Sequence, residues 1–493
     1  VAFYEYISKQ MKTEKNTGNI ATKISLFDSV LPIFFLILLL FLNVYIFYGD
    51  SALEGSNQFI LLTGAFLAIL VGVKNKININ SIFNSISKNI ESIGTPILIL
   101  LLVGSLAGSW LLSGIIPSMI YYGFKIINAS FFLPSCIVIC ALTSFATGSS
   151  WSTSATVGIA LIGIGKVLGF DTGMVAGAVI SGAYFGDKMS PLSDTTNLAA
   201  AVTETNLFDH IKYMMITTFP TIVITFIFFL LFNLINLPND EISNQSYIEL
   251  IPNFFNTTPI LFLVPIFVII LIIKKINPVI ALFLGTLSAS FFALIFQGDT
   301  IDSIINNNPD QKLNEYMVIM NSIVGDTNIQ TNINFLDELL YSSGMAGMLD
   351  TVWLVICAMV FGGAMDGIGA LKKISSTLLD YAKSTFSLFA NTVFSCLTVN
   401  LSASDQYLSI VIPGKMYSES YRERGLSSVN LSRTIEDSGT VTSVLIPWNT
   451  CGAYQSSVLN VGVFDYFIYA IFNWLSPITT LTVAYLKFKI KKV

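Results

Sequence analysis

The sequence predicts an all-α polytopic membrane protein with about 11–13 transmembrane segments, some of them broken by Gly or Pro. Of its 493 residues, 53% are hydrophobic and only 11% are charged, and the mean hydropathy is +0.72. Soluble proteins carry about 25% charged residues, so this composition excludes a water-soluble protein of this size. The apolar runs are continuous rather than alternating, which also excludes a membrane β-barrel.

The expected organisation has five parts that follow the apolar runs. The first spans are expected at 31–48 and 59–73, and further runs continue to residue 486. The predicted parts are a cytoplasmic N-terminal segment (1–28), a first transporter repeat (29–237), a loop (238–258), a second repeat (259–486) with an external loop (298–337), and a basic cytoplasmic tail (487–493).

Lysines indicate which side of the membrane each loop faces. Lys74, Lys76 and Lys88 follow the second run, whereas the loop before that run contains acids and no base. The positive-inside rule therefore places the N-terminus and residues 74–91 in the cytoplasm. Isoleucines on one face of 77–90 predict an amphipathic helix at the membrane interface. No cleavable signal peptide is expected, and the expected location is the cytoplasmic (inner) membrane.

Three pairs of sequence blocks recur in the same order along the chain. GSLAG at 104–108 matches GAMDG at 363–367, and GDKMSPLS at 186–193 matches EDSGTVTS at 436–443. A weaker pair is TGSSWSTSA, which begins at Thr147, and NLSASDQYL, which begins at Asn400. Together they predict a duplicated fold, with the inverted arrangement of the two copies favoured. The glycines of the first pair predict close helix packing rather than a ligand loop.

Charged side chains within apolar stretches mark the predicted site. A carboxylate at the centre of a transmembrane helix costs about 2.5–3.5 kcal/mol, so each such residue requires a reason. The primary candidates for ion binding and proton coupling are Asp187, Asp194, Glu436 and Asp437. Secondary candidates supply hydroxyl, amide or carboxylate oxygens: Ser190, Ser193, Thr196, Asn197, Asp405, Thr440 and Asn449. Lys188 and Arg433 are predicted to compensate the negative charge.

Oxygen ligands of this kind suit a hard cation such as Na⁺, and the scarcity of His and Cys in the set argues against transition metals. A buried carboxylate holds either a proton or Na⁺, so the two ions compete, and this competition predicts antiport. No catalytic residues and no cofactor are expected. The expected partners are Na⁺, H⁺ and the lipid bilayer, without nucleic acid.

Structural roles remain open for several of these residues. Asp194 precedes TTNL and could be a helix N-cap, and Asp187 with Lys188 could be an ion pair at a helix end. Glu436 and Asp437 could form an interfacial cluster with Arg433. The single histidine, His210, is expected at the membrane interface.

Longer motifs show a resemblance to a known family. The stretches at 182–200, 403–417 and 431–454, together with GSLAGSWLLSG at 104–114, resemble the NhaC-type Na⁺/H⁺ antiporter family of the ion-transporter superfamily. The resemblance implies Na⁺ export coupled to H⁺ uptake, two inverted repeats with helical hairpins, and elevator-like movement. Members of the superfamily are often dimers, so a homodimer is also implied.

Two other functions stay open at this stage. The family includes exchangers of small organic anions, of the malate/lactate type, and proteins suspected of moving amino acids; Arg433 or Lys188 could bind a substrate carboxylate. A channel is the third alternative, although duplication around broken segments favours alternating access.

Overall fold

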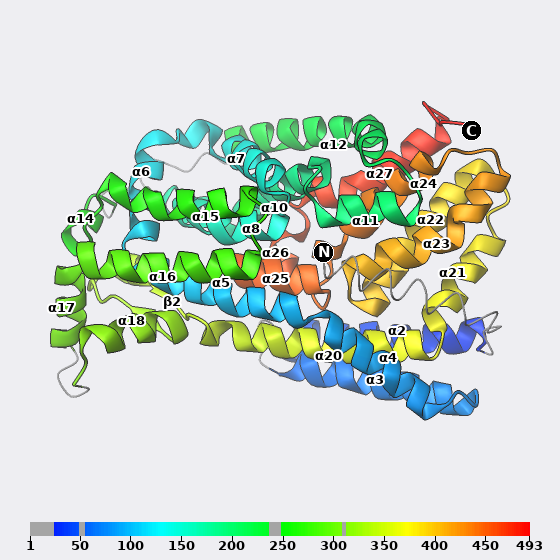
Figure 1. Ribbon diagram of the computed structural model, residues 1–493, viewed down its shortest axis with the longest axis horizontal. Helices are drawn as coiled ribbons and strands as arrows, with labels where there is room; N and C mark the ends of the chain where they lie inside the picture. Colours follow the sequence, from blue (N-terminus) through cyan, green and yellow to red (C-terminus); the bar gives the residue numbers. More distant parts are fainter. Residues whose placement is uncertain (1–23, 49–54, 236–247, 308–311) are drawn as a thin grey trace.

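A computed structural model describes residues 24–48, 55–235, 248–307 and 312–493 (Figure 1). Within these residues, seven helical stretches are long and apolar enough to cross a membrane, and three shorter apolar helices accompany them. The chain is therefore an all-α multi-pass membrane protein, as predicted. The total of about 11–13 segments also counts broken helices and stays a prediction.

The first half of the chain runs from α2 to α12. Its elements are α2 (Leu26–Leu42), η1 (Asn43–Tyr48), α3 (Ser56–Lys74), α4 (Ile79–Ser92), α5 (Gly94–Leu112), α6 (Ile115–Ile126), η3 (Ala129–Phe131), α7 (Phe132–Thr147), α8 (Ser150–Thr153), η4 (Ser154–Gly158), α9 (Ile159–Val167), α10 (Thr172–Met189), α11 (Asp194–Val202) and α12 (Leu207–Ile235).

The second half runs from α14 to α27. Its elements are α14 (Ile251–Phe254), η6 (Pro259–Phe262), α15 (Leu263–Ile273), α16 (Pro278–Phe296), α17 (Gly298–Asn307), α18 (Glu315–Val324), β1 (Thr327–Asn328), α19 (Asn334–Leu339), β2 (Tyr341–Ser342), η8 (Ala346–Met348), α20 (Leu349–Gly367), α21 (Ala370–Asp380), α22 (Thr385–Ala403), α23 (Gln406–Glu423), α24 (Ser428–Ile435), η9 (Glu436–Thr440), η10 (Ser443–Leu445), α25 (Thr450–Leu459), α26 (Val463–Phe467) and α27 (Ile471–Tyr485).

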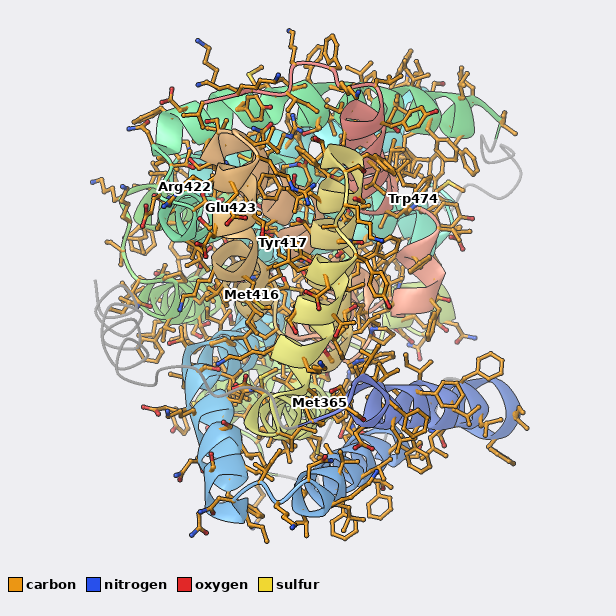
Figure 2. All side chains as sticks on the ribbon, turned by 90° about the vertical axis from the view of Figure 1, so that its right-hand side faces the viewer. Met365, Met416, Tyr417, Arg422, Glu423 and Trp474 are labelled. Carbon is orange, nitrogen blue, oxygen red and sulfur yellow. The ribbon has the colours of Figure 1, made fainter. Side chains whose placement is uncertain are left out.

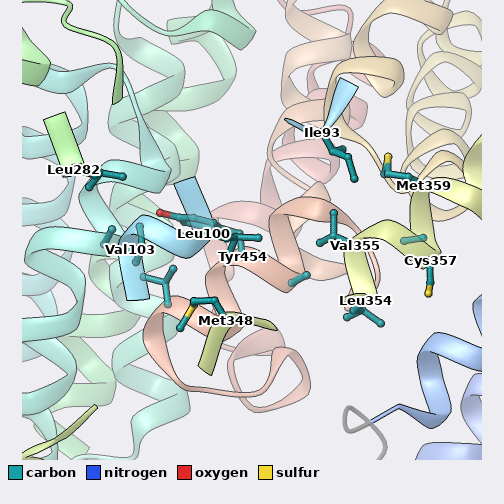
Figure 3. Packing of buried hydrophobic residues seen from close by; sticks show 14 of the residues in the cluster. Ile93, Leu100, Val103, Leu282, Met348, Leu354, Val355, Cys357, Met359 and Tyr454 are labelled. Carbon is teal, nitrogen blue, oxygen red and sulfur yellow. The ribbon is translucent and has the colours of Figure 1, made fainter. Parts of the chain in front are cut away.

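Many of the long helices lie roughly parallel to the long axis of the molecule, as α12, α15, α16 and α20 do in Figure 1. Helix α10 packs on α7, α12 on α27, and α20 on α3 and α4. Leu100 and Val103 of α5 meet Val355 of α20 and Tyr454 of α25 in one buried apolar cluster (Figure 3). This cluster joins the two halves of the sequence.

Backbone landmarks recur in the two halves. Gly114 and Gly369 adopt left-handed backbone immediately before α6 and α21, and Gly148 and Ser404 do so at the ends of α7 and α22. The second member of each pair follows the first at almost the same separation. The landmarks are consistent with the predicted duplication, while the orientation of the two copies stays a prediction.

The predicted external loop at 298–337 is not an irregular loop. Its described residues form α17, α18 and α19, and α18 packs on α5. A Cβ on Gly108 would collide with the carbonyl oxygen of Ser322 in α18, so α18 lies directly against the α5 backbone. Within the described residues, strands are limited to the antiparallel pair β1–β2, which precedes and follows α19.

The predicted amphipathic helix at 77–90 is confirmed as α4. Ile82 and Ile86 are buried against α20, whereas Phe83 is exposed. A Cβ on Gly363 of α20 would lie 2.6 Å from the Cα atom of Ile86. The glycines of the repeated block therefore serve close helix packing, as predicted.

Replacement of Gly186 by alanine tests this kind of contact at the helix that carries the candidate site. The added Cβ would collide with the carbonyl oxygen of Ala141 on α7. Backbone cannot retreat cheaply, so we expect a loss of about 1–3 kcal/mol of stability, measured as a lower midpoint of thermal unfolding in detergent. The control is Gly298→Ala, because nothing lies within 4 Å of a Cβ at that helix start. Equal midpoints for the two variants would contradict the packing argument.

Candidate functional site

The stretch 182–202 forms the end of α10, a tight loop, and α11. Asp187 and Lys188 lie in the last turn of α10, and Ser193 caps α11 by accepting a hydrogen bond from the Thr196 backbone N–H (3.4 Å). The Asn197 amide donates to the Ser193 carbonyl oxygen (2.6 Å) and to that of Pro191. Ser193 and Asn197 therefore stabilise the loop, independently of any role in ion binding. Ser190 accepts from the Leu192 backbone N–H in the same loop (3.2 Å).

The facing segment comes from the second half of the chain. Helix α24 changes at Glu436 into the π-helical turn η9, and all five residues of this turn are buried. π-Helical turns are rare and are frequent at functional sites, because they rotate side chains out of the regular helical register. Glu436 and Asp437 occupy the first two positions of this turn.

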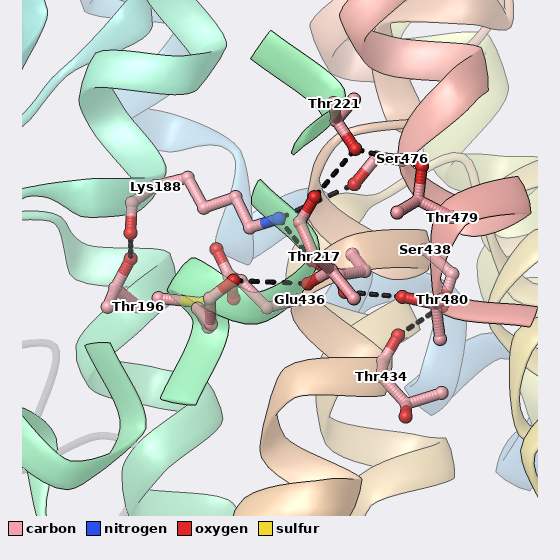
Figure 4. Close-up of polar contacts among 12 residues, drawn as sticks. Lys188, Thr196, Thr217, Thr221, Thr434, Glu436, Ser438, Ser476, Thr479 and Thr480 are labelled. Carbon is pink, nitrogen blue, oxygen red and sulfur yellow. Dashed lines mark hydrogen bonds and ion pairs between the residues drawn. The ribbon is translucent and has the colours of Figure 1, made fainter. Parts of the chain in front are cut away.

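Lys188 and Asp437 form an ion pair between these two segments. Both side chains are completely buried (0% exposed). Asp437 also accepts a hydrogen bond from Thr480 of α27, and the Lys188 ammonium donates to Ser476 of the same helix (3.4 Å). Figure 4 shows the Lys188 side chain extending from α10 to this group. Both buried charges are thus paired, as buried charges must be.

Glu436 is only half satisfied. Its Oε1 accepts a hydrogen bond from the Thr195 hydroxyl of α11 (3.2 Å), but Oε2 is buried without a partner. The hydroxyl oxygen of Thr440, in the last position of η9, is likewise buried without a partner. Buried polar atoms without partners are uncommon in native proteins and point to an ion or water held there.

Asp187 is half satisfied in the same way. Its Oδ2 accepts from the backbone N–H (3.0 Å) and the hydroxyl (2.7 Å) of Ser150, at the start of α8. Its Oδ1 is buried without a partner. Asp187 and Glu436 lie close enough to repel each other electrostatically. A cation placed near both would remove that repulsion and supply a partner to each carboxylate.

Arg433 is also completely buried (0% exposed), one turn before Asp437. None of its three guanidinium nitrogens has a hydrogen-bond acceptor, and the guanidinium carbon lies 4.7 Å from the centre of the Tyr213 ring. Arg433 forms no ion pair with a carboxylate in the described part of the chain, and its role in compensating negative charge stays a prediction. A buried guanidinium held only by an aromatic ring keeps its charge uncompensated locally.

Five charged side chains of these two segments are buried. They are Asp187, Lys188, Arg433, Glu436 and Asp437, so the set carries a net charge of −1 when every member is ionised. Among the described residues, no group of three or more His, Cys, Asp or Glu side chains could hold a metal ion. Any cation here would be bound by two carboxylates together with hydroxyl oxygens.

Other predicted site residues do not belong to this set of five buried charges. Asp194 is exposed, accepts from the Tyr407 hydroxyl (2.7 Å), and is not the cap of α11, because Ser193 takes that position. Asp405 caps α23 by accepting from the Leu408 backbone N–H (2.9 Å). Asn449 caps α25 and donates to Asn400, which in turn donates to the Gly439 carbonyl oxygen of η9. Thr196 donates to the Lys188 carbonyl oxygen (3.0 Å).

Other contacts were not predicted from the sequence. His210 is completely buried inside the protein and bonded to Ser432 (2.8 Å), whereas its expected position at the membrane interface stays a prediction. The partners Ser150, Thr195, Ser476 and Thr480 are absent from the predicted site set. The signal for the last two was available, because Ser476 and Thr480 are four residues apart and therefore lie on one face of α27.

Comparisons with known proteins show the family to which the chain belongs. Residues 182–488 match the model of the Na⁺/H⁺ antiporter family, and this range holds both halves of the site except Ser150. The chain belongs to this family. It is 36% identical to the Na⁺/H⁺ antiporter NhaC of Alkalihalophilus pseudofirmus, over 79% of this chain and 82% of that protein. The NhaC antiporter of Bacillus subtilis is 34% identical, over 83% and 87% respectively.

A third relative of this antiporter-family protein carries a different name. The malate-2H⁺/Na⁺-lactate antiporter of Bacillus subtilis is 33% identical, over 85% of this chain and 86% of that protein. Membership of the family therefore does not by itself fix what is exchanged.

Proposed function

We propose that this protein exchanges Na⁺ for H⁺ across the cytoplasmic membrane, with Na⁺ bound between Asp187 and Glu436. One observation carries the proposal: two buried carboxylates, one from each half of the chain, influence each other electrostatically, and each has one oxygen without a hydrogen-bond partner. The unpartnered hydroxyl of Thr440 is a third oxygen for the ion. Oxygens of this type are the ligands that hard cations take.

The charge of the buried set accounts for exchange rather than simple binding. With a net charge of −1, the set is neutralised by one Na⁺ or by one proton, and the same carboxylate oxygens take either ion. The Lys188–Asp437 pair contributes no net charge and ties α10 to η9. A loaded, neutral set costs less to carry through a change of access than an empty, charged one, so movement is coupled to loading.

Transport by the purified protein in liposomes with an internal pH dye tests the proposal. We expect external Na⁺ alone to dissipate an imposed proton gradient, with a rate that saturates as the Na⁺ concentration rises. A rate that does not saturate and needs no counter-ion would instead identify a channel and contradict the proposal. Crosslinking in the same membranes tests the expected homodimer.

A second candidate, exchange of a small organic anion, is favoured by Arg433. A completely buried guanidinium without an acceptor is suited to bind a carboxylate, and the relative named as a malate-2H⁺/Na⁺-lactate antiporter belongs to the same family. In the liposome experiment, a requirement for malate or lactate in addition to Na⁺ would select this function over simple Na⁺/H⁺ exchange.

A further inference from the structure

The last residues of the sequence, 487–493, are bonded to the start of α24. The Lys491 carbonyl oxygen accepts hydrogen bonds from the Ser427 backbone N–H (3.0 Å) and the Asn430 side-chain amide (2.7 Å). The Val493 backbone N–H donates to the Gly425 carbonyl oxygen (3.0 Å). Ser427 is the N-cap of α24, so this tail, residues 487–493, is attached to the helix that leads into Glu436 and Asp437.

Tyr213 of α12 joins the tail to the buried site. Its hydroxyl lies 2.8 Å from the Lys489 carbonyl oxygen and 2.5 Å from the Asn430 side-chain oxygen, and it accepts from the Lys491 backbone N–H (3.2 Å). Its ring lies beneath the buried guanidinium of Arg433. Tyr213 therefore contacts both the tail and α24.

The lysine side chains of the tail are exposed, whereas Ile490 packs against buried residues. Four lysines are exposed, and in the described part of the chain no carboxylate forms an ion pair with any of them: Lys487, Lys489, Lys491 and Lys492. Phe488 is 51% exposed between the first two lysines, and Tyr485 just before them is 72% exposed. Basic and aromatic residues in this alternation are typical of segments that lie at a membrane surface.

The backbone of the tail is strained. Lys487 and Lys489 have φ angles of 53° and 48°, in the left-handed region that non-glycine residues rarely adopt. Such a conformation costs about 1–3 kcal/mol per residue and persists only where the surroundings hold it. The hydrogen bonds to Tyr213, Asn430 and Ser427 help to keep this backbone conformation in place. The four unneutralised positive charges lie close together and repel one another, which opposes the conformation.

We propose that this tail is a binding surface for anionic lipid headgroups, and that headgroup binding stabilises the position of α24 and of the carboxylates of η9 that follow it. Headgroup charge would neutralise the lysines while their backbone stays bonded to α24. The expected cytoplasmic side of the tail is where the membrane surface is negative, and each lysine near such a surface gains about 1 kcal/mol. The same end of the molecule faces the viewer in Figure 2, where α23 ends near Arg422 and Glu423.

The test combines lipid composition with the charge of the tail. The transport measurement in this test rests on the proposed Na⁺/H⁺ exchange. Lipid binding is therefore measured separately, as the thermal stabilisation of the detergent-purified full chain by added phosphatidylglycerol. We expect phosphatidylglycerol in phosphatidylcholine liposomes to raise the exchange rate about threefold or more, and this gain to disappear at high salt. The variant with all four tail lysines changed to glutamine should lose both the rate increase and the stabilisation.

The control variant changes four exposed lysines outside both the tail and α4 to glutamine: Lys274, Lys275, Lys312 and Lys383. It has the same loss of charge and should respond to phosphatidylglycerol like the original chain. Tyr213→Phe keeps the ring beneath Arg433 but removes the hydroxyl, so its binding of phosphatidylglycerol should persist while the rate increase falls.

Either of two results would overturn the inference: a tail variant that keeps the full response to phosphatidylglycerol, or a control variant that loses the response equally. If the original chain shows no exchange in any lipid, the proposed function fails. In that case stabilisation by phosphatidylglycerol, lost only in the tail variant, would still support the lipid-binding surface, and its absence would overturn that as well.

Discussion

Replacement of Glu436 by glutamine is expected to lower Na⁺-driven proton movement about 100-fold or more while the protein still folds. Glutamine has the same shape and keeps an oxygen to accept from the Thr195 hydroxyl (3.2 Å from Oε1 in the structure). It carries no charge, so it neither attracts Na⁺ nor exchanges a proton. The loss of a charged contact in a buried site is worth several kcal/mol, and each 1.4 kcal/mol is about tenfold in binding. The measurement is the signal of the internal pH dye in liposomes as a function of the Na⁺ concentration.

Asp405→Asn is the matched control for this variant. It also removes one negative charge from a buried residue, but Asp405 caps α23, and asparagine is as good a cap as aspartate. We expect exchange within about twofold of the original rate, because a preserved cap leaves the fold unchanged. Full exchange in Glu436→Gln, or equal loss in the two variants, would contradict the assignment of Glu436 as an ion ligand.

The class of fold follows from composition, because a chain with so few charged residues has no surface for water. The helices within 298–337 cannot be predicted from composition in the same way. That range is polar and rich in Asn, which indicates a loop, yet α18 packs against α5 where Gly108 leaves room for Ser322. A contact between residues so far apart in sequence depends on tertiary packing, which local composition does not encode.

The candidate site is predictable in its charges but not in its partners. Asp187, Glu436 and Asp437 stand out because carboxylates in apolar segments are costly. The sequence does not predict which hydroxyl contacts Glu436. Thr195 and Thr196 are adjacent on α11 and point in different directions. Only the packing of α11 places Thr195, rather than Thr196, against Glu436.

Two features of the site have no signature in a single sequence. The π-helical turn at Glu436 arises from the surroundings of α24, and its residues have no pattern that distinguishes it from an α-helix. The exposure of Asp194 has a similar origin, because it depends on which face of α11 meets α23. Burial of His210 against Ser432 likewise required the packing of α12 on α24.

Removing one partner of the Lys188–Asp437 pair is expected to be among the most destabilising changes in the protein. Lys188→Met leaves the buried carboxyl group of Asp437 without its cationic partner and with a hydrogen bond from the Thr480 hydroxyl, and breaking a buried pair in this way costs about 3–5 kcal/mol. The matched control is Lys74→Met, which breaks an ion pair of 2.7 Å whose lysine is 66% exposed. Because this lysine is largely exposed, and Asp28, itself 7% exposed, keeps the Asn75 side-chain amide as a donor (3.1 Å), the loss should be closer to the value of about 0–1 kcal/mol for surface pairs. The midpoint of thermal unfolding should therefore fall much less than in Lys188→Met.

The double variant Lys188→Met/Asp437→Asn separates charge compensation from ion binding. It removes one positive and one negative charge, so the buried set keeps its net charge of −1, and the asparagine can still accept from Thr480. We therefore expect a midpoint of thermal unfolding above that of Lys188→Met and measurable Na⁺/H⁺ exchange, in contrast to Glu436→Gln. If the stability loss of the double variant equalled the sum of the losses of Lys188→Met and Asp437→Asn, the two residues would not be coupled, and this would contradict the pairing. Loss of exchange in a stable double variant would instead place Lys188 or Asp437 among the groups that handle the transported ions.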